Sequence, residues 1–118
     1  MATAIERGFA SQLAEDLPPE DVRLVLNVFQ ADVTRLSQVM RVAAAAGDVT
    51  NFRRVAHSLA GASGAVGATA LEEACRLAMT RADIGPAEFP ATSGEINRLC
   101  ADTLNELAAF VAALDARA

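Results

Sequence analysis

Residues 56–67 read AHSLAGASGAVG and contain the only histidine of the chain, His57. The apolar residues in and before this stretch recur at helical spacing. At about 100° of rotation per residue they share one direction, and His57 points roughly 150° away from it. The residues that share the inward direction are Phe52, Val55, Ala56, Leu59, Ser63 and Val66. We therefore predict a helix that buries this side and holds the imidazole in solvent.

The residues expected around the exposed imidazole are small, polar or basic. A glycine inside a helix costs about 1 kcal/mol relative to alanine, so Gly61 needs a reason other than helix stability. The missing side chain one turn after His57 lets a second protein surface approach the ring. Close packing against another helix is the alternative, and it is disfavoured because Gly61 points away from the core. The expected surface neighbours of His57 are Thr50, Arg53, Ala60, Gly61 and Gly64.

The same spacing continues on both sides of this stretch and predicts a helical bundle. A long helix follows Pro19 and stops at Gly47, another follows Gly67, and a last one follows the loop at 85–94. We predict an all-α fold in one domain, residues 1–118: an antiparallel up-down four-helix bundle with a short additional N-terminal helix. The inward sets of these three helices are Val22, Leu26, Phe29, Val33, Leu36, Met40 and Ala43; Leu71, Ala74, Cys75 and Ala78; and Ile96, Leu99, Thr103, Leu107, Phe110 and Leu114.

Capping signals predict where the helices begin. Asp48 can cap the helix that carries His57. The helix after Gly67 should end by Gly85 and Pro86. The short first helix carries Ile5, Phe9 and Leu13 at four-residue spacing. Three pairs have the spacing of a capping box, namely Thr3 with Glu6, Thr69 with Glu72 and Thr92 with Glu95.

A second, thinner apolar strip runs along the long helix, about 125° around from its inward side. It consists of Leu24, Val28, Val39 and Val42, and Asp32 interrupts it. We expect the first helix to cover part of this strip. The alternative is that some of it stays open for a docking partner.

The composition excludes several classes of function. A formal net charge of −5 argues against a nucleic-acid partner, which would require a basic face. No run of about 18 apolar residues predicts a membrane span, so we expect a cytoplasmic protein without a membrane partner. Cys75 and Cys100 lack the spacing of a zinc site, and a single histidine cannot complete one, so no metal site is predicted. We expect both cysteines to be buried free thiols.

The chemistry open to one exposed imidazole is narrow. Near neutral pH such a ring is largely uncharged, and one nitrogen keeps a lone pair that can act as a nucleophile. No serine or cysteine nucleophile with an orienting third group accompanies His57. No phosphate-binding loop of the GxxxxGK[ST] type is present, so the chain cannot energise a phosphoryl group from ATP alone. A partner must supply the phosphoryl group.

The run AHSLAGASGAVGATALEEACRLA, residues 56–78, resembles the signature of histidine-containing phosphotransfer (HPt) domains. The matching positions are Ala56, His57, Leu59, Gly61, Gly67, Ala68, Leu71, Cys75 and Leu77. The resemblance implies a monomeric four-helix bundle that takes a phosphoryl group from the aspartyl phosphate of one receiver domain and passes it to another. It implies that His57 is the phosphoryl carrier and that Gly61 gives the receiver's loops room. It also implies no cofactor on this chain, since Mg²⁺ belongs to the receiver's acidic pocket.

One position departs from the family pattern. The lysine that usually follows the histidine by three residues is Ala60 here, and all ten basic residues are arginines. Arg53, one turn before His57, and Arg54 are the candidates to stabilise the phosphoryl group in its place, with Arg76 on the next helix a weaker one. The alternative function is a module that docks receivers of response regulators or hybrid histidine kinases without efficient phosphotransfer.

Overall fold

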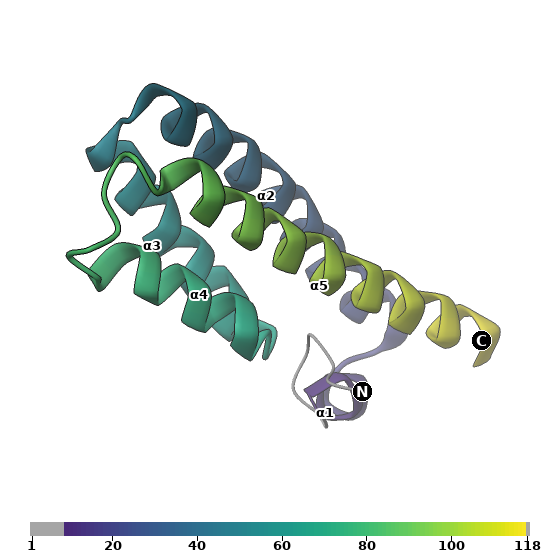
Figure 1. Ribbon diagram of the computed structural model, residues 1–118. Helices are drawn as coiled ribbons and strands as arrows, with labels where there is room; N and C mark the ends of the chain where they lie inside the picture. Colours follow the sequence, from purple (N-terminus) through teal and green to yellow (C-terminus); the bar gives the residue numbers. More distant parts are fainter. Residues whose placement is uncertain (1–8, 118) are drawn as a thin grey trace.

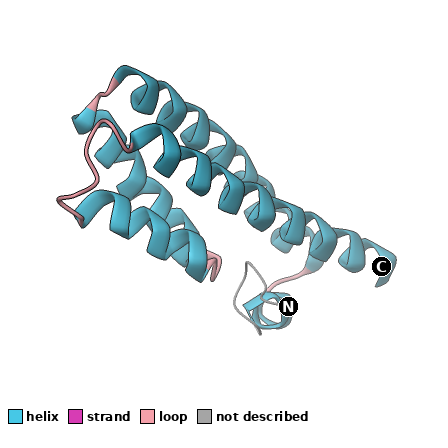
Figure 2. Cartoon of the chain, viewed as in Figure 1, coloured by secondary structure: helices cyan, strands magenta, loops and turns pink. Residues whose placement is uncertain are grey.

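The computed structural model describes residues 9–117, and every regular element in that range is a helix (Figures 1 and 2). The helices are α1 (Phe9–Asp16), α2 (Pro19–Ala46), α3 (Val49–Ala65), α4 (Thr69–Thr80) and α5 (Phe89–Arg117). The fold is the predicted all-α helical bundle. The described helices are joined by short turns except between α4 and α5, where a longer loop runs along one end (Figure 2).

Two long helices form the spine of the molecule. α2 has 28 residues and α5 has 29, and they lie side by side along an elongated body of 48 × 24 × 20 Å (Figure 1). The shorter hairpin of α3 and α4 packs against one half of this spine, and α1 lies near the other end. The helix that carries His57 is therefore held on two sides, by α2 and by α4.

The ends of α2 follow from its flanking residues. Pro18 is extended, with ψ at 152°, and Pro19 occupies the first helical turn, where its missing N–H costs nothing. Gly47 ends the helix with φ at +64°, a backbone conformation that glycine adopts without penalty. The predicted limits of this helix are confirmed.

The His57 helix begins and ends close to the predicted positions. The N–H of Asn51 donates to Asp48 Oδ1 at 3.1 Å, so Asp48 caps α3 as predicted. The helix continues through Gly64 to Ala65, and the chain then turns at Gly67, where φ is +70°. This tight turn makes α3 and α4 antiparallel neighbours along their length.

The predicted starts of α4 and α5 were wrong in detail. The N-cap residue of α4 is Ala68, whose methyl group cannot accept a hydrogen bond, so Thr69 is the first helical residue and not the cap. Glu72 forms an ion pair with Arg76 of its own helix. α5 begins at Phe89, so Thr92 lies inside its first turn and donates its N–H to the Glu88 carbonyl at 3.0 Å. α4 ends at Thr80, before Gly85 and Pro86, as predicted. Thr3, Ile5 and Glu6 lie outside the described residues.

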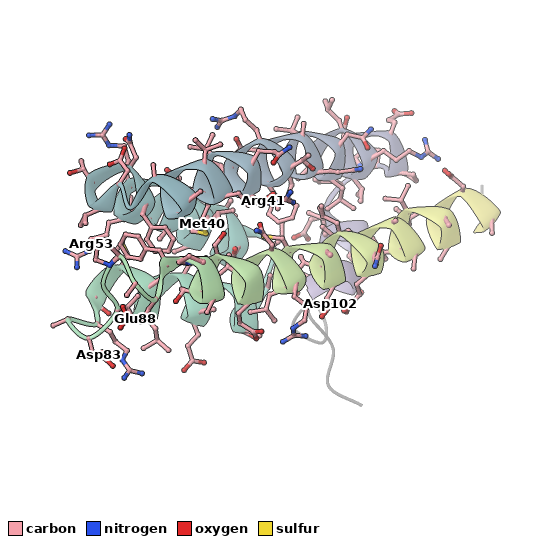
Figure 3. The ribbon with its side chains drawn as sticks, turned by 45° about the horizontal axis from the view of Figure 1, so that its top comes forward. Met40, Arg41, Arg53, Asp83, Glu88 and Asp102 are labelled. Carbon is pink, nitrogen blue, oxygen red and sulfur yellow. The ribbon has the colours of Figure 1, made fainter. Side chains whose placement is uncertain are left out.

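One hydrophobic core runs between the helices. Every predicted inward residue of α2 and α3 is buried, and Met40 lies on the side of α2 that faces α5 (Figure 3). In α4 and α5 the inward sets are buried or half-buried. The fully buried side chains of greatest volume include Phe52, Phe89, Met40, Leu59, Leu71 and Ile96. The core therefore fixes α3 with a defined outward side.

The second apolar strip of α2 is exposed, so the expectation that the first helix covers part of it was wrong. Leu24, Val28 and Val42 have exposed fractions of 63, 62 and 70%. Leu13 of α1 instead packs against the main core. None of the described helices is both long and apolar enough to cross a bilayer.

Candidate functional site

His57 lies in the middle of α3 with its side chain exposed. The residue before it, Ala56, and the residue two positions after it, Leu59, are completely buried. The packing on both sides of His57 fixes the helix against rotation, so the ring is held outward. The structure places His57 where the helical spacing predicted it.

The imidazole borders a shallow hollow of about 390 Å³ between α3 and α4. The residues that line this hollow, called the His57 hollow below, are His57, Ala60, Gly61, Arg76, Met79 and Thr80. Half of them come from α4, which the hairpin turn brings alongside α3. The ring therefore has free space next to it on the side of α4.

Two glycines of α3 have different surroundings. A Cβ atom placed on Gly61 would meet no atom within 4 Å, so the backbone one turn after His57 is open. Gly64 is exposed too, but a Cβ atom on it would lie 3.0 Å from Glu72 Oε2, so a carboxylate stands beside its backbone. Of these two glycines, only Gly61 offers an unobstructed approach toward the ring.

Ala60 corrects the prediction that it is exposed. Its exposed fraction is 6%, and its methyl group forms part of the wall of the His57 hollow. On the helical wheel Ala60 lies at the border between the inward and outward sides, and α4 packs over that border. Thr50, which was also predicted near His57, is exposed in the first turn of α3.

The arginines around the site are not equivalent. Arg53 and Arg54 are exposed on α3, and Arg53 points outward at one end of the bundle (Figure 3). Neither of them lines the His57 hollow. Arg76 of α4 does line it, and its Nη2 atom is 2.5 Å from Glu72 Oε2. The sequence makes Arg76 the weakest of the three candidates, whereas the structure places it at the hollow, because the register of the hairpin brings α4 beside His57.

The two thiols cannot serve as nucleophiles at this site. Cys75 and Cys100 are free and buried. Burial, together with the neighbouring Cys100, raises the pKa of Cys75 to about 12, and burial raises the pKa of Cys100 to about 11. Both therefore stay protonated and unreactive at neutral pH. Within residues 9–117, no three His, Cys, Asp or Glu side chains gather to hold a metal ion.

The geometry restricts the chemistry of the site to one nucleophile. An exposed imidazole carries a lone pair, has open space beside it, and has an arginine at the same hollow. This arrangement suits transfer of an anionic group that another protein presents, because that partner can reach the ring over the bare backbone at Gly61.

Comparison with known proteins supports this interpretation. The model of the Hpt domain family matches residues 24–117, which run from the first turns of α2 to the end of α5. No curated protein and no solved structure gives a significant match to the chain. Since the family match covers most of the sequence, the chain belongs to the Hpt domain family, whose members have phosphotransfer roles in phosphorelays and interact with receiver domains.

Proposed function

We propose that His57 is the phosphoryl carrier of a multistep two-component phosphorelay. It accepts the phosphoryl group from an aspartyl phosphate on one receiver domain and passes it to the aspartate of a second. The observation that supports this most strongly is the pairing of an exposed imidazole with an open backbone at Gly61 on a rigid helix. The membership in the Hpt family supports the same assignment.

The transfer step balances without a cofactor on this chain. The lone pair of the solvent-facing ring nitrogen attacks the phosphorus of the aspartyl phosphate. A P–N bond forms while the P–O bond to the aspartate breaks, and the aspartate leaves as a carboxylate with the bonding electrons. The other ring nitrogen keeps its proton. Attack by the carboxylate of a second receiver reverses these steps and restores the neutral imidazole.

The partners in this proposal are receiver domains of response regulators or hybrid histidine kinases. Their acidic pockets hold the Mg²⁺ that the transfer requires, so the metal arrives with the partner. Arg53 and Arg54 are exposed beside the approach to His57 and suit the attraction of such a pocket. Thr50, Ala60, Gly61 and Gly64 complete the proposed docking region. We place the protein in the cytoplasm as a monomer.

A second candidate is a module that docks receivers without carrying phosphate. Ala60 favours it, because the side chain that follows His57 on the wall of the hollow is a methyl group and cannot hold phosphoryl oxygens. The two candidates share a docking surface and differ only in whether a P–N bond forms. A binding measurement alone therefore cannot separate them.

The separating experiment follows label from a phosphorylated receiver to this chain. The carrier function requires acid-labile label on the wild type and none on His57→Gln, with equal receiver affinity for both proteins. Equal affinity without label on the wild type, while the receiver is demonstrably phosphorylated, would support the docking module. Label on His57→Gln would refute the assignment of His57.

A further inference from the structure

We infer that Arg76 holds the phosphoryl group once it is on His57, and that Glu72 holds Arg76 while the histidine is unmodified. The inference rests on the proposed function, because it assigns further residues to the same site. It replaces the expectation that the phosphoryl-binding cation comes from α3. The argument starts from the residues that line the His57 hollow.

A phosphoryl group on the ring brings negative charge and three acceptor oxygens that need donors. Among the described residues that line the His57 hollow, Arg76 is the one with a permanent positive charge. Its guanidinium presents a planar fork of N–H donors, the geometry that binds phosphate oxygens in pairs. The Thr80 hydroxyl already donates to the Arg76 carbonyl at 2.8 Å, and the thioether of Met79 has no proton to donate. Arg76 is therefore the strong donor of the hollow.

The wall between the two helices leaves Arg76 room to reach the ring. Ala60 lies at this wall, is 6% exposed as a residue, and has only a methyl group as its side chain. A long side chain at position 60 would occupy the hollow between His57 and Arg76. Ala60 stands where the family usually has a lysine, so α3 offers no cation at this position. The same small side chain leaves space for Arg76 of α4 to reach His57.

Glu72 gives Arg76 a resting position. The Glu72 side chain is 25% exposed, and its carboxylate lies against the bare backbone of Gly64, with Oε2 3.0 Å from where a Cβ would stand. Arg76 also lines a neighbouring hollow together with Thr69, Glu72 and Glu73. The Arg76 side chain therefore lies at the border between the Glu72 carboxylate and the His57 hollow.

The ion pair between Glu72 and Arg76 is weak enough for Arg76 to leave Glu72 and bind a phosphoryl group. The Arg76 side chain is 65% exposed, and an ion pair with that much solvent contributes little to stability. A phosphoryl group carries more negative charge than one carboxylate and offers more acceptor oxygens. Phosphorylation of His57 therefore draws the guanidinium away from Glu72, and loss of the phosphoryl group returns it.

The inference predicts opposite effects for the two partners. Arg76→Gln removes the cation and shifts the transfer equilibrium from phosphohistidine toward the phosphorylated receiver, by about fivefold for one exposed charged hydrogen bond. Arg76→Lys keeps the charge without the fork and falls between Arg76→Gln and the wild type. Glu72→Gln removes the competing carboxylate and shifts the same equilibrium toward phosphohistidine, by about two- to threefold.

The experiment measures the ratio of phosphorylated His57 to phosphorylated receiver at equilibrium for the wild type and each variant. The matched control is Arg98→Gln on α5, since Arg98 is 60% exposed and pairs with Glu95 three residues earlier but does not line the His57 hollow. Its ratio should equal that of the wild type. Thermal unfolding of each variant establishes that the fold is kept.

The outcomes separate this inference from the proposed function. A wild type that takes no label on His57 overturns both. A labelled wild type whose ratio is unchanged in Arg76→Gln and Glu72→Gln overturns the role of Arg76 alone. If Arg76→Gln does not fold, Arg76→Lys and Glu72→Gln decide the matter by shifting the ratio in opposite directions or failing to do so.

Discussion

The rings of Phe52 and Phe89 stack with their centroids 3.9 Å apart and their planes 10° from parallel. Phe52 belongs to the first turn of α3 and Phe89 is the first residue of α5, and both are completely buried. This contact ties the helix of His57 to the end of the loop that joins α4 to α5. It also explains why α5 begins three residues before the predicted Thr92 cap, because the helix starts at the residue that enters the core.

Phe89→Ala should therefore destabilise the bundle strongly. Removal of a fully buried phenylalanine side chain lowers the free energy of unfolding by about 3 to 5 kcal/mol. Urea unfolding of the wild type and the variant measures this loss. Val42→Ala, at a position 70% exposed, is the control and should change the free energy by less than about 0.5 kcal/mol. A loss below about 1 kcal/mol in Phe89→Ala would show that the ring stack does not hold the bundle.

Gly61→Gln should slow phosphotransfer without harming the fold. A Cβ atom at this position meets no atom within 4 Å, and any residue other than glycine or proline improves helix propensity, by up to about 1 kcal/mol. The new side chain projects into the path by which a receiver reaches His57. Rapid-quench measurements with a phosphorylated receiver should show transfer at least about tenfold slower than in the wild type. This corresponds to an activation free energy about 1.4 kcal/mol higher.

Gly94→Gln is the matched control for that variant. Gly94 is likewise exposed inside a helix, and a Cβ there meets no atom within 4 Å, but it lies on α5. Both variants should gain similar stability, and only Gly61→Gln should slow transfer. Equal transfer rates for the two variants would contradict the steric role of Gly61.

The stability of the fold should fall in alkaline solution because of the two buried thiols. Burial raises the pKa of Cys75 to about 12 and that of Cys100 to about 11, against 9.0 for an exposed thiol. Above pH 9 the unfolded chain releases thiol protons that the folded chain keeps, so stability present below pH 9 is lost as the pH rises. At pH 10 the loss is about 1.4 kcal/mol for each thiol.

In this chain the loss of stability between pH 9 and 11 can be assigned to the two thiols. It contains no tyrosine, and all ten of its basic residues are arginines, so few other groups titrate between pH 9 and 11. Urea midpoints at pH 8 and pH 10 should differ for the wild type and nearly coincide for the Cys75→Ala, Cys100→Ala double variant. The same drop in both proteins would assign the alkaline instability to another cause.

Arg53 and Arg54 should speed association with a receiver through charge. Both are exposed beside the approach to His57, and receivers present an acidic pocket. The association rate of the wild type should fall several-fold, on the order of fivefold, between 20 and 150 mM salt. The Arg53→Gln, Arg54→Gln double variant should associate more slowly at low salt and respond less to added salt, while Arg98→Gln should behave as the wild type. A wild type without salt dependence would remove this role.

Much of the fold could be predicted from the sequence, because the inward and outward sides of a helix follow from the spacing of residues within that helix alone. The inward residues of α2 and α3, the Asp48 cap and the exposure of His57 all follow from a rotation of about 100° per residue and from local capping. Features that depend on a second helix were not readable in this way. Ala60 is covered because α4 packs over the border of α3.

The same distinction applies to the site. The sequence placed Arg53 next to His57 because the two residues lie one turn apart, whereas Arg76 reaches the His57 hollow only through the register of the hairpin around Gly67. Glu72 has the spacing of a capping box with Thr69, but it pairs with Arg76 instead. Competition between partners for one carboxylate cannot be decided from spacing alone.

The most direct test of the account uses the fact that His57 is the only histidine. Labelling histidine with ¹⁵N gives one imidazole, whose two ring nitrogens report on this site alone in an NMR spectrum. On addition of a phosphorylated receiver with Mg²⁺, we predict that one ring nitrogen shifts and acquires coupling to phosphorus. Ring resonances that stay unchanged, while the labelled backbone amide of His57 reports that the phosphorylated receiver is bound, would contradict the claim that His57 carries the phosphoryl group.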